Sequence, residues 1–229
     1  MIPSAVETAT RPRLVLDGVS KRWRGTDAPL FHDVHLELPQ GTLALVMGRN
    51  GAGKTTLLRI VAGIIAADDG HVELDGLTSR RDRRRYQAKV GFLSAGSTGL
   101  YARLTVAQHL GYWARLALIP AAERGARIDT ALARFELEDI ANRRASRLSM
   151  GQRQRLTLAL ALMHDPVLIL FDEPWNSLDG QGVELLNTVI ADFAGRGGSG
   201  LFCIPSGHPL EDIPIDVVYS LSDGTLEDA

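Results

Sequence analysis

Gly48-Arg49-Asn50-Gly51-Ala52-Gly53-Lys54-Thr55-Thr56 is the stretch of this sequence that decides its fold. It matches the phosphate-binding pattern G-x-x-x-x-G-K-[ST] in full. In this pattern the glycines let main-chain N–H groups surround a chain of phosphates, Lys54 reaches the β- and γ-oxygens, and the Thr55 hydroxyl ligates Mg²⁺. The stretch therefore predicts a site for a nucleoside triphosphate and Mg²⁺, built from the residues Gly48 to Thr56.

The residues on either side of this loop predict the strand and the helix that such a loop requires. The run 42–47 is Thr-Leu-Ala-Leu-Val-Met and predicts a buried strand. The run 55–66 has apolar residues at helical spacing, so we expect a helix whose N-terminal dipole faces the phosphates. The alternative, a Gly-rich turn without a ligand, is much weaker because it does not explain Lys54 or these flanks.

Composition and charge describe an ordinary globular chain. Its 229 residues are 45% apolar and 23% charged, and 25 basic against 27 acidic side chains give a net charge of −2. This balance excludes a global electrostatic attraction to nucleic acid or to an anionic membrane surface. The single cysteine, Cys203, excludes an internal disulfide. With no signal-peptide pattern and no apolar run near the roughly twenty residues of a membrane span, we expect a cytoplasmic protein.

Hydrophobic patterning predicts an α/β fold with three parts. Residues 1–12 are expected to be a flexible lead-in, followed by one domain over 13–229. Alternation predicts an antiparallel β-layer, and the unbroken apolar run 167–171 predicts a central parallel strand. Helical spacing predicts an inserted helical subdomain over about 98–165. The expected segments are strands over 14–16, 34–38, 72–74, 201–204 and 217–221, and helices over 150–164 and 181–194.

Two adjacent carboxylates follow the predicted central strand. Asp172 and Glu173 lie beside the phosphate loop if their strand neighbours the strand 42–47 in a parallel sheet. Asp172 would then hold Mg²⁺ through water, and Glu173 would orient or deprotonate a water that attacks the γ-phosphate in line. The alternative is that both residues only cap the loop that follows.

A serine and a glutamine three residues apart precede the helix predicted over 150–164. Ser149 and Gln152 form a capping-box pattern, which by itself predicts only a well-capped helix. A helix N-terminus with a serine hydroxyl and the nearby Gly151 is also suited to bind an anion such as a γ-phosphate. The pattern leaves both interpretations open.

The order of these motifs resembles that of the ATP-binding-cassette (ABC) ATPases. The phosphate loop is followed by Leu-Ser-Met-Gly-Gln at 148–152, Leu-Ile-Leu-Phe-Asp-Glu-Pro at 168–174 and Ser-Leu-Asp at 177–179. The resemblance covers about 13–227 and implies a P-loop NTPase core with ATP and Mg²⁺ as cofactors. It also implies that Ser149, Gly151 and Gln152 contact the ATP held by a second cassette, so that two subunits enclose two nucleotides.

Three further positions match the family one by one. Trp23 stands where the family has an aromatic ring that stacks on adenine, and stacking requires only a π-face. Asp179 matches the aspartate of the loop that connects the two nucleotide sites. His208 matches the switch histidine that contacts the γ-phosphate. Without the resemblance, a Trp in a β-region indicates packing and a lone loop His indicates a solvated side chain.

One position departs from the family. Where its members have a glutamine that touches Mg²⁺ and the attacking water, this chain has Ala95, and Ser94 or Ser97 could replace that glutamine only in part. This departure predicts slow hydrolysis or an altered coupling to transport. The run from Arg80 to Arg85 would suit a nucleic acid, but a solvated helix start is the stronger interpretation in a neutral chain, and no nucleic-acid partner is expected.

The resemblance therefore implies the ATP-hydrolysing subunit of an ABC transporter, peripheral on the inner face of the membrane. A separate permease is expected to dock near Leu93–Leu104, and 99–106 most resembles cassettes of exporters. The alternative suggested by Ala95 is an ATP-gated dimerisation module with weak hydrolysis. A DNA-repair or translation type is weaker still, because it would bring a coiled coil or a second cassette.

Overall fold

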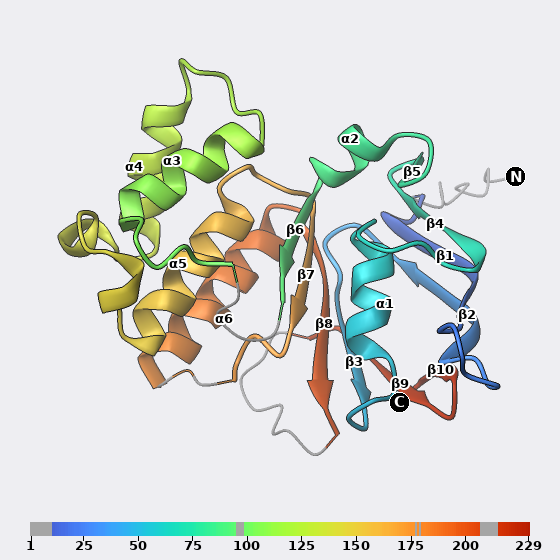
Figure 1. The fold of residues 1–229 in the computed structure, drawn as a ribbon. Helices are drawn as coiled ribbons and strands as arrows, with labels where there is room; N and C mark the ends of the chain where they lie inside the picture. Colours follow the sequence, from blue (N-terminus) through green and yellow to red (C-terminus); the bar gives the residue numbers. More distant parts are fainter. Residues whose placement is uncertain (1–10, 95–98, 177, 179, 207–214) are drawn as a thin grey trace, which may run out of the picture.

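The computed structural model describes residues 11–94, 99–176, 178, 180–206 and 215–229, and these residues form two sheets flanked by helices (Figure 1). The larger sheet has the strand order β10-β9-β3-β8-β7-β6. Its strands are parallel except for β10, which pairs with β9 in an antiparallel hairpin. They are β3 (Leu43–Gly48), β6 (Val90–Leu93), β7 (Leu168–Asp172), β8 (Ser199–Pro205), β9 (Val217–Ser222) and β10 (Thr225–Asp228).

The smaller sheet is antiparallel throughout, with the order β2-β1-β4-β5. It consists of β1 (Leu14–Lys21), β2 (Phe31–Leu38), β4 (Asp69–Leu74) and β5 (Leu77–Thr78). Alternation explains β2, where buried Val34, Leu36 and Leu38 alternate with exposed side chains. One face of this sheet is therefore available for packing on the rest of the domain.

Side-chain alternation along β3 divides the interior into two cores. Leu43 and Leu45 belong to a core shared with helices α3 (Val106–Leu116), α4 (Arg124–Arg134), α5 (Met150–Leu162) and α6 (Gly180–Gly195). Ala44 and Val46 point the other way, into a core shared with the antiparallel sheet, α1 (Lys54–Val61) and α2 (Arg83–Gln87). Because successive strand residues face opposite sides, one parallel sheet separates the two groups of elements, as Figure 1 shows.

The predicted fold class is confirmed: an α/β chain with a parallel central sheet, an antiparallel β-layer and added helices. Helices α3, α4 and α5 and the 3₁₀ turns Glu138–Ile140 and Ala145–Arg147 lie within the range predicted for the helical subdomain, whose boundaries stay a prediction. The helix after the phosphate loop is shorter than expected and ends at Val61. Most of the predicted lead-in, residues 1–10, is outside the described part of the chain.

Candidate functional site

The phosphate-loop residues connect the end of β3 to the first turn of α1, and the backbone there requires glycine. Gly51 and Gly53 have φ values of 86° and 107°, in the left-handed region that glycine adopts without strain. A Cβ on Gly53 would lie 2.9 Å from Cδ1 of Phe31 and 3.0 Å from Cγ of Leu30. A Cβ on Gly48 would lie 2.5 Å from the carbonyl oxygen of Leu221. The loop is thus packed directly against its neighbours.

Lys54 is held inside the curl of the loop. Its Nζ donates hydrogen bonds to the carbonyl oxygens of Gly48 (2.7 Å) and Arg49 (3.1 Å), and the residue is only 6% exposed. A buried ammonium is costly unless it is paired, so these carbonyls stabilise it when no anion is present. The same position would bring Nζ next to phosphate oxygens enclosed by the loop.

Thr55 and Asp172 are in direct contact. The Thr55 hydroxyl donates to Oδ2 of Asp172 at 2.7 Å, and Asp172 is 2% exposed at the end of β7. The assumption that β3 and β7 are neighbours is wrong, because β8 lies between them. Helix α1 packs over β7 and β8 and thereby brings Thr55 to the carboxylate.

The donor set of this pair suits Mg²⁺. Thr55 and Asp172 offer one hydroxyl and one carboxylate, and Mg²⁺ in nucleotide sites takes one or two such protein oxygens with phosphates and water completing the octahedron. A denser site is not available, since the described residues contain no cluster of three or more His, Cys, Asp or Glu side chains able to hold a metal. The residues present therefore fit a metal that arrives with a nucleotide.

Glu173 follows Asp172 in an unusual backbone conformation. Its φ is 50°, a left-handed conformation that costs a non-glycine residue about 1–2 kcal/mol. Two contacts hold it there: its N–H donates to the carbonyl oxygen of Cys203 at 2.8 Å, and Nδ2 of Asn176 donates to its Oε2. Cys203 itself is completely buried in β8. The carboxylate is thus fixed by its surroundings next to the phosphate loop.

A cavity of about 350 Å³ lies between the loop and these groups. Trp23 lines this cavity and also lines a second cavity of about 540 Å³. The Trp23 side chain is exposed at 46%, and Nζ of Lys21 lies 5.3 Å from its ring centroid. The 350 Å³ cavity is lined by Trp23, Leu30, Asn50, Gly51, Gly53, Lys54, Thr55, Thr56 and Glu173.

Ser149 and Gln152 form the predicted capping box. The Ser149 hydroxyl accepts the Gln152 N–H at 3.2 Å, and Oε1 of Gln152 accepts the Ser149 N–H at 3.1 Å. A Cβ on Gly151 would meet no described atom within 4 Å, so the backbone there is open to an approaching group. The interpretation of this motif as a well-capped helix N-terminus is therefore confirmed, and its anion-binding interpretation stays a prediction.

The capping box and the phosphate loop lie on opposite faces of the parallel sheet. Helix α5 packs in the core with α3, α4 and α6, whereas α1 packs in the core with the antiparallel sheet. None of Ser149, Gly151 and Gln152 lines the 350 Å³ cavity. Within one chain, the structure does not bring these two candidate site parts together.

Some predicted positions are outside the described residues, and some contacts were missed. Asp179, His208, Ala95 and Ser97 fall in the gaps of the described ranges. Sequence reasoning missed Asn176, which contacts the Glu173 carboxylate, and Leu30, which packs on Gly53 and lines the cavity. Asn176 could have been found from its spacing of three after Glu173, a distance that side chains span in a turn.

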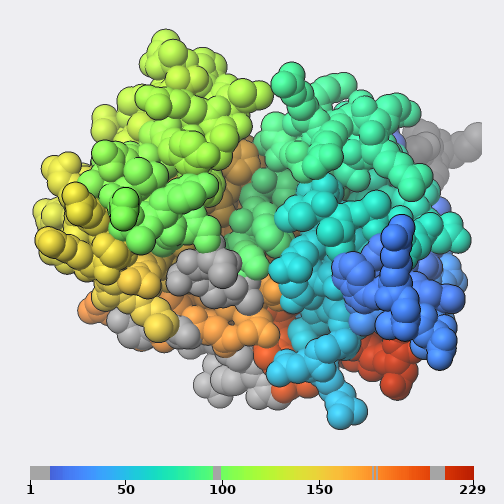
Figure 2. All heavy atoms as spheres, viewed as in Figure 1, coloured from blue at the N-terminus to red at the C-terminus, as the bar shows by residue number. Residues whose placement is uncertain are grey.

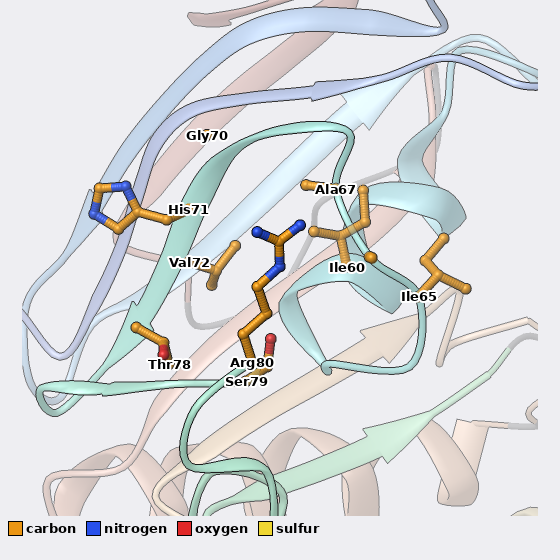
Figure 3. A pocket seen from close by; sticks show the side chains of 10 residues that line it. Ile60, Ile65, Ala67, Gly70, His71, Val72, Thr78, Ser79 and Arg80 are labelled. Carbon is orange, nitrogen blue, oxygen red and sulfur yellow. The ribbon is translucent and has the colours of Figure 1, made fainter.

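Two other hollows differ from this site. Figure 3 shows a cavity beside α1 and β4, about 160 Å³ in volume, whose walls combine apolar side chains with the polar His71, Thr78, Ser79 and Arg80 and include no phosphate-loop residue. Figure 2 shows a groove between the α2 segment and the helices around α3, with a volume of about 500 Å³. Its walls are Arg84, Gln87, Ala88, Val90, Phe92, Trp113, Leu116, Ala117, Leu118, Leu160, Ala161 and His164.

The sequence relatives of this chain are ATP-binding proteins of ABC transporters. A family profile described as "ABC transporter" matches residues 31–176. The chain is 36% identical over 181 residues to the ABC transporter ATP-binding protein NatA of Bacillus subtilis (strain 168), covering 79% of this chain and 72% of that protein. It is 36% identical over 166 residues to the Fe(3+) ions import ATP-binding protein FbpC of Escherichia coli (strain K12), covering 72% and 46%. The chain thus spans about half the length of such import proteins.

Solved structures share the fold. A structure described as the ATP binding subunit of an ABC transporter superposes with a TM-score of 0.83 at 23% identity, covering 93% of this chain and 87% of that one. The ATP-binding cassette MJ0796, in a dimeric post-hydrolysis state bound to ADP and Pi, superposes with a TM-score of 0.80 at 25% identity, covering 94% and 98%. Among the described residues, no helix combines the length and the apolar character required to cross a bilayer.

Proposed function

This chain belongs to the ABC transporter family, and from that premise we propose that it binds and hydrolyses ATP as the motor subunit of a transporter. The observation that supports hydrolysis is the arrangement of Thr55, Asp172 and Glu173. Thr55 and Asp172 are hydrogen bonded beside the cavity, and Glu173 is fixed against it by Asn176 and the Cys203 carbonyl. A hydroxyl and a carboxylate for a metal and a second carboxylate for the attacking water are the kinds of group that phosphoryl transfer to water uses.

Each residue has a separate task in the proposed mechanism. Lys54 exchanges its bonds to the Gly48 and Arg49 carbonyls for phosphate oxygens, and the N–H groups of 51–56 complete the cradle. Thr55 and Asp172 would hold Mg²⁺, which would supply positive charge to neutralise the phosphates. Glu173 accepts a proton from, or orients, the attacking water.

Trp23 is proposed to stack on the adenine. Its ring borders the 350 Å³ cavity, and Lys21 lies over the ring. A base would therefore use the ring face that Lys21 does not cover, which places the sugar between Trp23 and the loop. Stacking of this kind is worth about 0.5–1.5 kcal/mol beyond the burial of the ring area.

We propose that Ser149, Gly151 and Gln152 act on the nucleotide of a second cassette. Their separation from the loop of their own chain by the parallel sheet supports this arrangement. Asp179 and His208 are proposed to complete the two sites, as the resemblance implies. The partner cassette is a second copy of this chain or a related one.

A separate permease is proposed to dock near Leu93–Leu104, which would place the chain on the inner face of the membrane. The 500 Å³ groove opens beside β6 and presents the exposed apolar side chains Leu116 (58%) and Leu118 (69%). Exposed apolar surface around a groove is typical of an interaction site. The export direction predicted from 99–106 finds no support among the relatives, several of which are named import proteins, so we propose transport without a direction.

The experiment that tests hydrolysis compares steady-state ATPase activity of the wild type and Glu173→Gln, with Asn176 unchanged in both. We expect turnover to fall by about 10²–10⁴-fold in the variant while ATP binding is retained, because only the proton acceptor is lost. Equal turnover in both proteins would overturn the role of Glu173. If both proteins bind ATP and neither shows turnover, the result would instead favour the ATP-gated dimerisation module that Ala95 suggests.

A further inference from the structure

His109 is a completely buried histidine outside the nucleotide site. It lies in the first turns of α3, with 0% of its surface exposed. Both ring nitrogens have main-chain partners: Nδ1 lies 2.9 Å from the carbonyl oxygen of Thr105, and Nε2 lies 2.9 Å from the amide nitrogen of Tyr101. A buried polar ring with both nitrogens paired is a rigid connection between the segments that it joins.

The partners determine which tautomer the ring adopts. A carbonyl oxygen only accepts, so Nδ1 carries the proton that is donated to Thr105. A main-chain N–H only donates, so Nε2 is the unprotonated acceptor of the Tyr101 N–H. The aromatic ring of Tyr101 also stacks on His109, with centroids 6.2 Å apart and an interplanar angle of 25°. His109 therefore holds both the backbone and the side chain of Tyr101 on α3.

Main-chain hydrogen bonds continue from Tyr101 toward the capping box. The Leu104 N–H donates to the Tyr101 carbonyl at 3.0 Å, which closes a turn. That turn accepts two hydrogen bonds from the segment before α5: Ala145 N–H donates to the Leu104 carbonyl at 2.9 Å, and Ser146 N–H donates to the Ala102 carbonyl at 3.1 Å.

The segment that donates these bonds leads directly to Ser149. Residues Ala145–Arg147 form a 3₁₀ turn, and the Leu148 N–H donates to the Ala145 carbonyl at 3.3 Å. Ser149 follows as the N-cap of α5. The turn 101–104 is therefore hydrogen bonded to the segment 145–148 that leads into the capping box.

We propose that His109 is a positioning residue for ATP hydrolysis: by holding the turn 101–104 on α3, it sets the position of Ser149 that a second cassette requires. This inference rests on the proposed function, because Ser149 acts only on a nucleotide in a dimer. The same turn lies at the end of the segment 93–104 at which the permease is proposed to dock. His109 thus connects the permease-facing segment to the N-terminus of α5 by fixed hydrogen bonds.

Two substitutions distinguish the hydrogen bond made by Nε2 from the one made by Nδ1. In His109→Gln the terminal amide reaches the position of Nε2 and can accept the Tyr101 N–H. In His109→Asn the shorter amide reaches only the position of Nδ1 and can bond Thr105 but not Tyr101. Both variants are polar and of similar bulk, so they are matched controls for each other.

We expect the amide of Tyr101 to exchange hydrogen at least about tenfold faster in His109→Asn than in the wild type, and at nearly the wild-type rate in His109→Gln. The kcat of ATP hydrolysis is expected to fall about tenfold in His109→Asn and less than about threefold in His109→Gln. ATP affinity of the isolated chain should change by less than about twofold in both, because the phosphate loop lies on the other face of the sheet.

The results decide the proposal in each case. The role of His109 is overturned if the Tyr101 amide exchanges at similar rates in the Asn and Gln variants. It is also overturned if kcat does not fall further in His109→Asn than in His109→Gln. If His109→Asn does not fold, His109→Gln decides alone: wild-type exchange and kcat support the connection through Nε2, and loss of both overturns it. If the wild type shows no ATPase activity, the proposed function fails, whereas the exchange rates still report whether His109 holds the turn.

Discussion

The N-termini of α1 and α5 are both candidate phosphate sites, yet they are built in opposite ways. The N-cap of α1 is Gly53, which has no side chain to cap the helix, and no described side chain makes a capping bond there. The N-cap of α5 is Ser149, whose capping box with Gln152 satisfies two N–H groups. The first helix therefore presents free N–H donors to a ligand, while the second stabilises itself until a ligand replaces its internal bonds.

This difference explains why one site is complete in a single chain and the other is not. At α1 the main-chain donors lie beside Lys54 and Thr55 in the same cavity, and Thr55 is hydrogen bonded to Asp172. At α5 the charge of a phosphate would have to come from another molecule, since the sheet separates Ser149 from its own loop. The expected outcomes of the following substitutions measure how far the two helix ends differ.

The largest effect is expected from Lys54→Ala at the uncapped end. Loss of charge-assisted bonds, worth about 1.5–3 kcal/mol each, should weaken ATP binding by about 100-fold or more. Isothermal titration calorimetry with ATP and Mg²⁺ measures this change. Lys89→Ala is the matched control. Nζ of Lys89 lies 2.7 Å from Oδ2 of Asp75, and Lys89 does not line the cavity, so this substitution should leave ATP affinity unchanged. Equal affinities for the two variants would remove Lys54 from the site.

A smaller effect is expected from crowding the same helix end. Gly53→Ala adds a Cβ within 3.0 Å of Phe31 and Leu30 at φ 107°, whereas Gly51→Ala adds one at φ 86° that meets no described atom within 4 Å. Both changes carry backbone strain of about 1–2 kcal/mol, but only the first also displaces packed side chains, at a further cost of about 1–3 kcal/mol. Chemical denaturation should show the larger loss for Gly53→Ala. A reversed order would mean that the loop adjusts freely.

Removal of the cap at α5 should have a modest effect on the isolated chain. Ser149→Ala should lower the free energy of unfolding by about 0.5–2 kcal/mol, and Ser149→Asp should restore most of it as an alternative cap. If the hydroxyl serves only the helix, ATPase activity should recover in Ser149→Asp as well. We expect it not to recover, because a carboxylate would repel the γ-phosphate of the partner site. Recovery of activity would assign Ser149 to capping alone.

The smallest effect is expected at the opposite end of α5. His164 donates from Nε2 to the Val90 carbonyl at 3.0 Å, and its pKa is lowered because burial disfavours the charged ring more than Val90 and Asp165 favour it. Between the lowered pKa and the unfolded value of about 6.5, the unfolded chain binds more protons, so stability falls as pH falls through this window. Denaturation at pH 8 and pH 5.5 should show a smaller loss for His164→Gln than for the wild type. Equal losses would contradict this assignment.

The fold class and the local geometry of the phosphate loop could be predicted from sequence because they depend on neighbours along the chain. Glycines at 51 and 53 determine the loop backbone, and the apolar run 167–171 determines the buried strand β7. A turn signal was available but unused for the hairpins β4–β5 and β9–β10. Asp75-Gly76 and Asp223-Gly224 both have positive φ at each residue, as a type I′ hairpin turn requires.

Strand order and the connection through His109 could not be predicted in the same way. The insertion of β8 between β3 and β7 depends on how residues far apart in sequence pack, and no local pattern encodes it. The bond from Tyr101 to His109 depends on the burial of a ring in α3, whereas a lone histidine in a helix usually indicates only a polar face. Site roles of Asp179 and His208 rest on the family resemblance alone.

The position of Cys203 has a practical consequence for labelling. Burial in β8 raises the pKa of its thiol well above the usual value, and the thiolate is the form that reacts. As the only cysteine of the chain, it should leave the folded protein inert toward maleimides. A cysteine introduced on the surface would then accept a dye or spin label without prior removal of a natural thiol. The rate at which Cys203 itself is modified would report how often the central sheet opens.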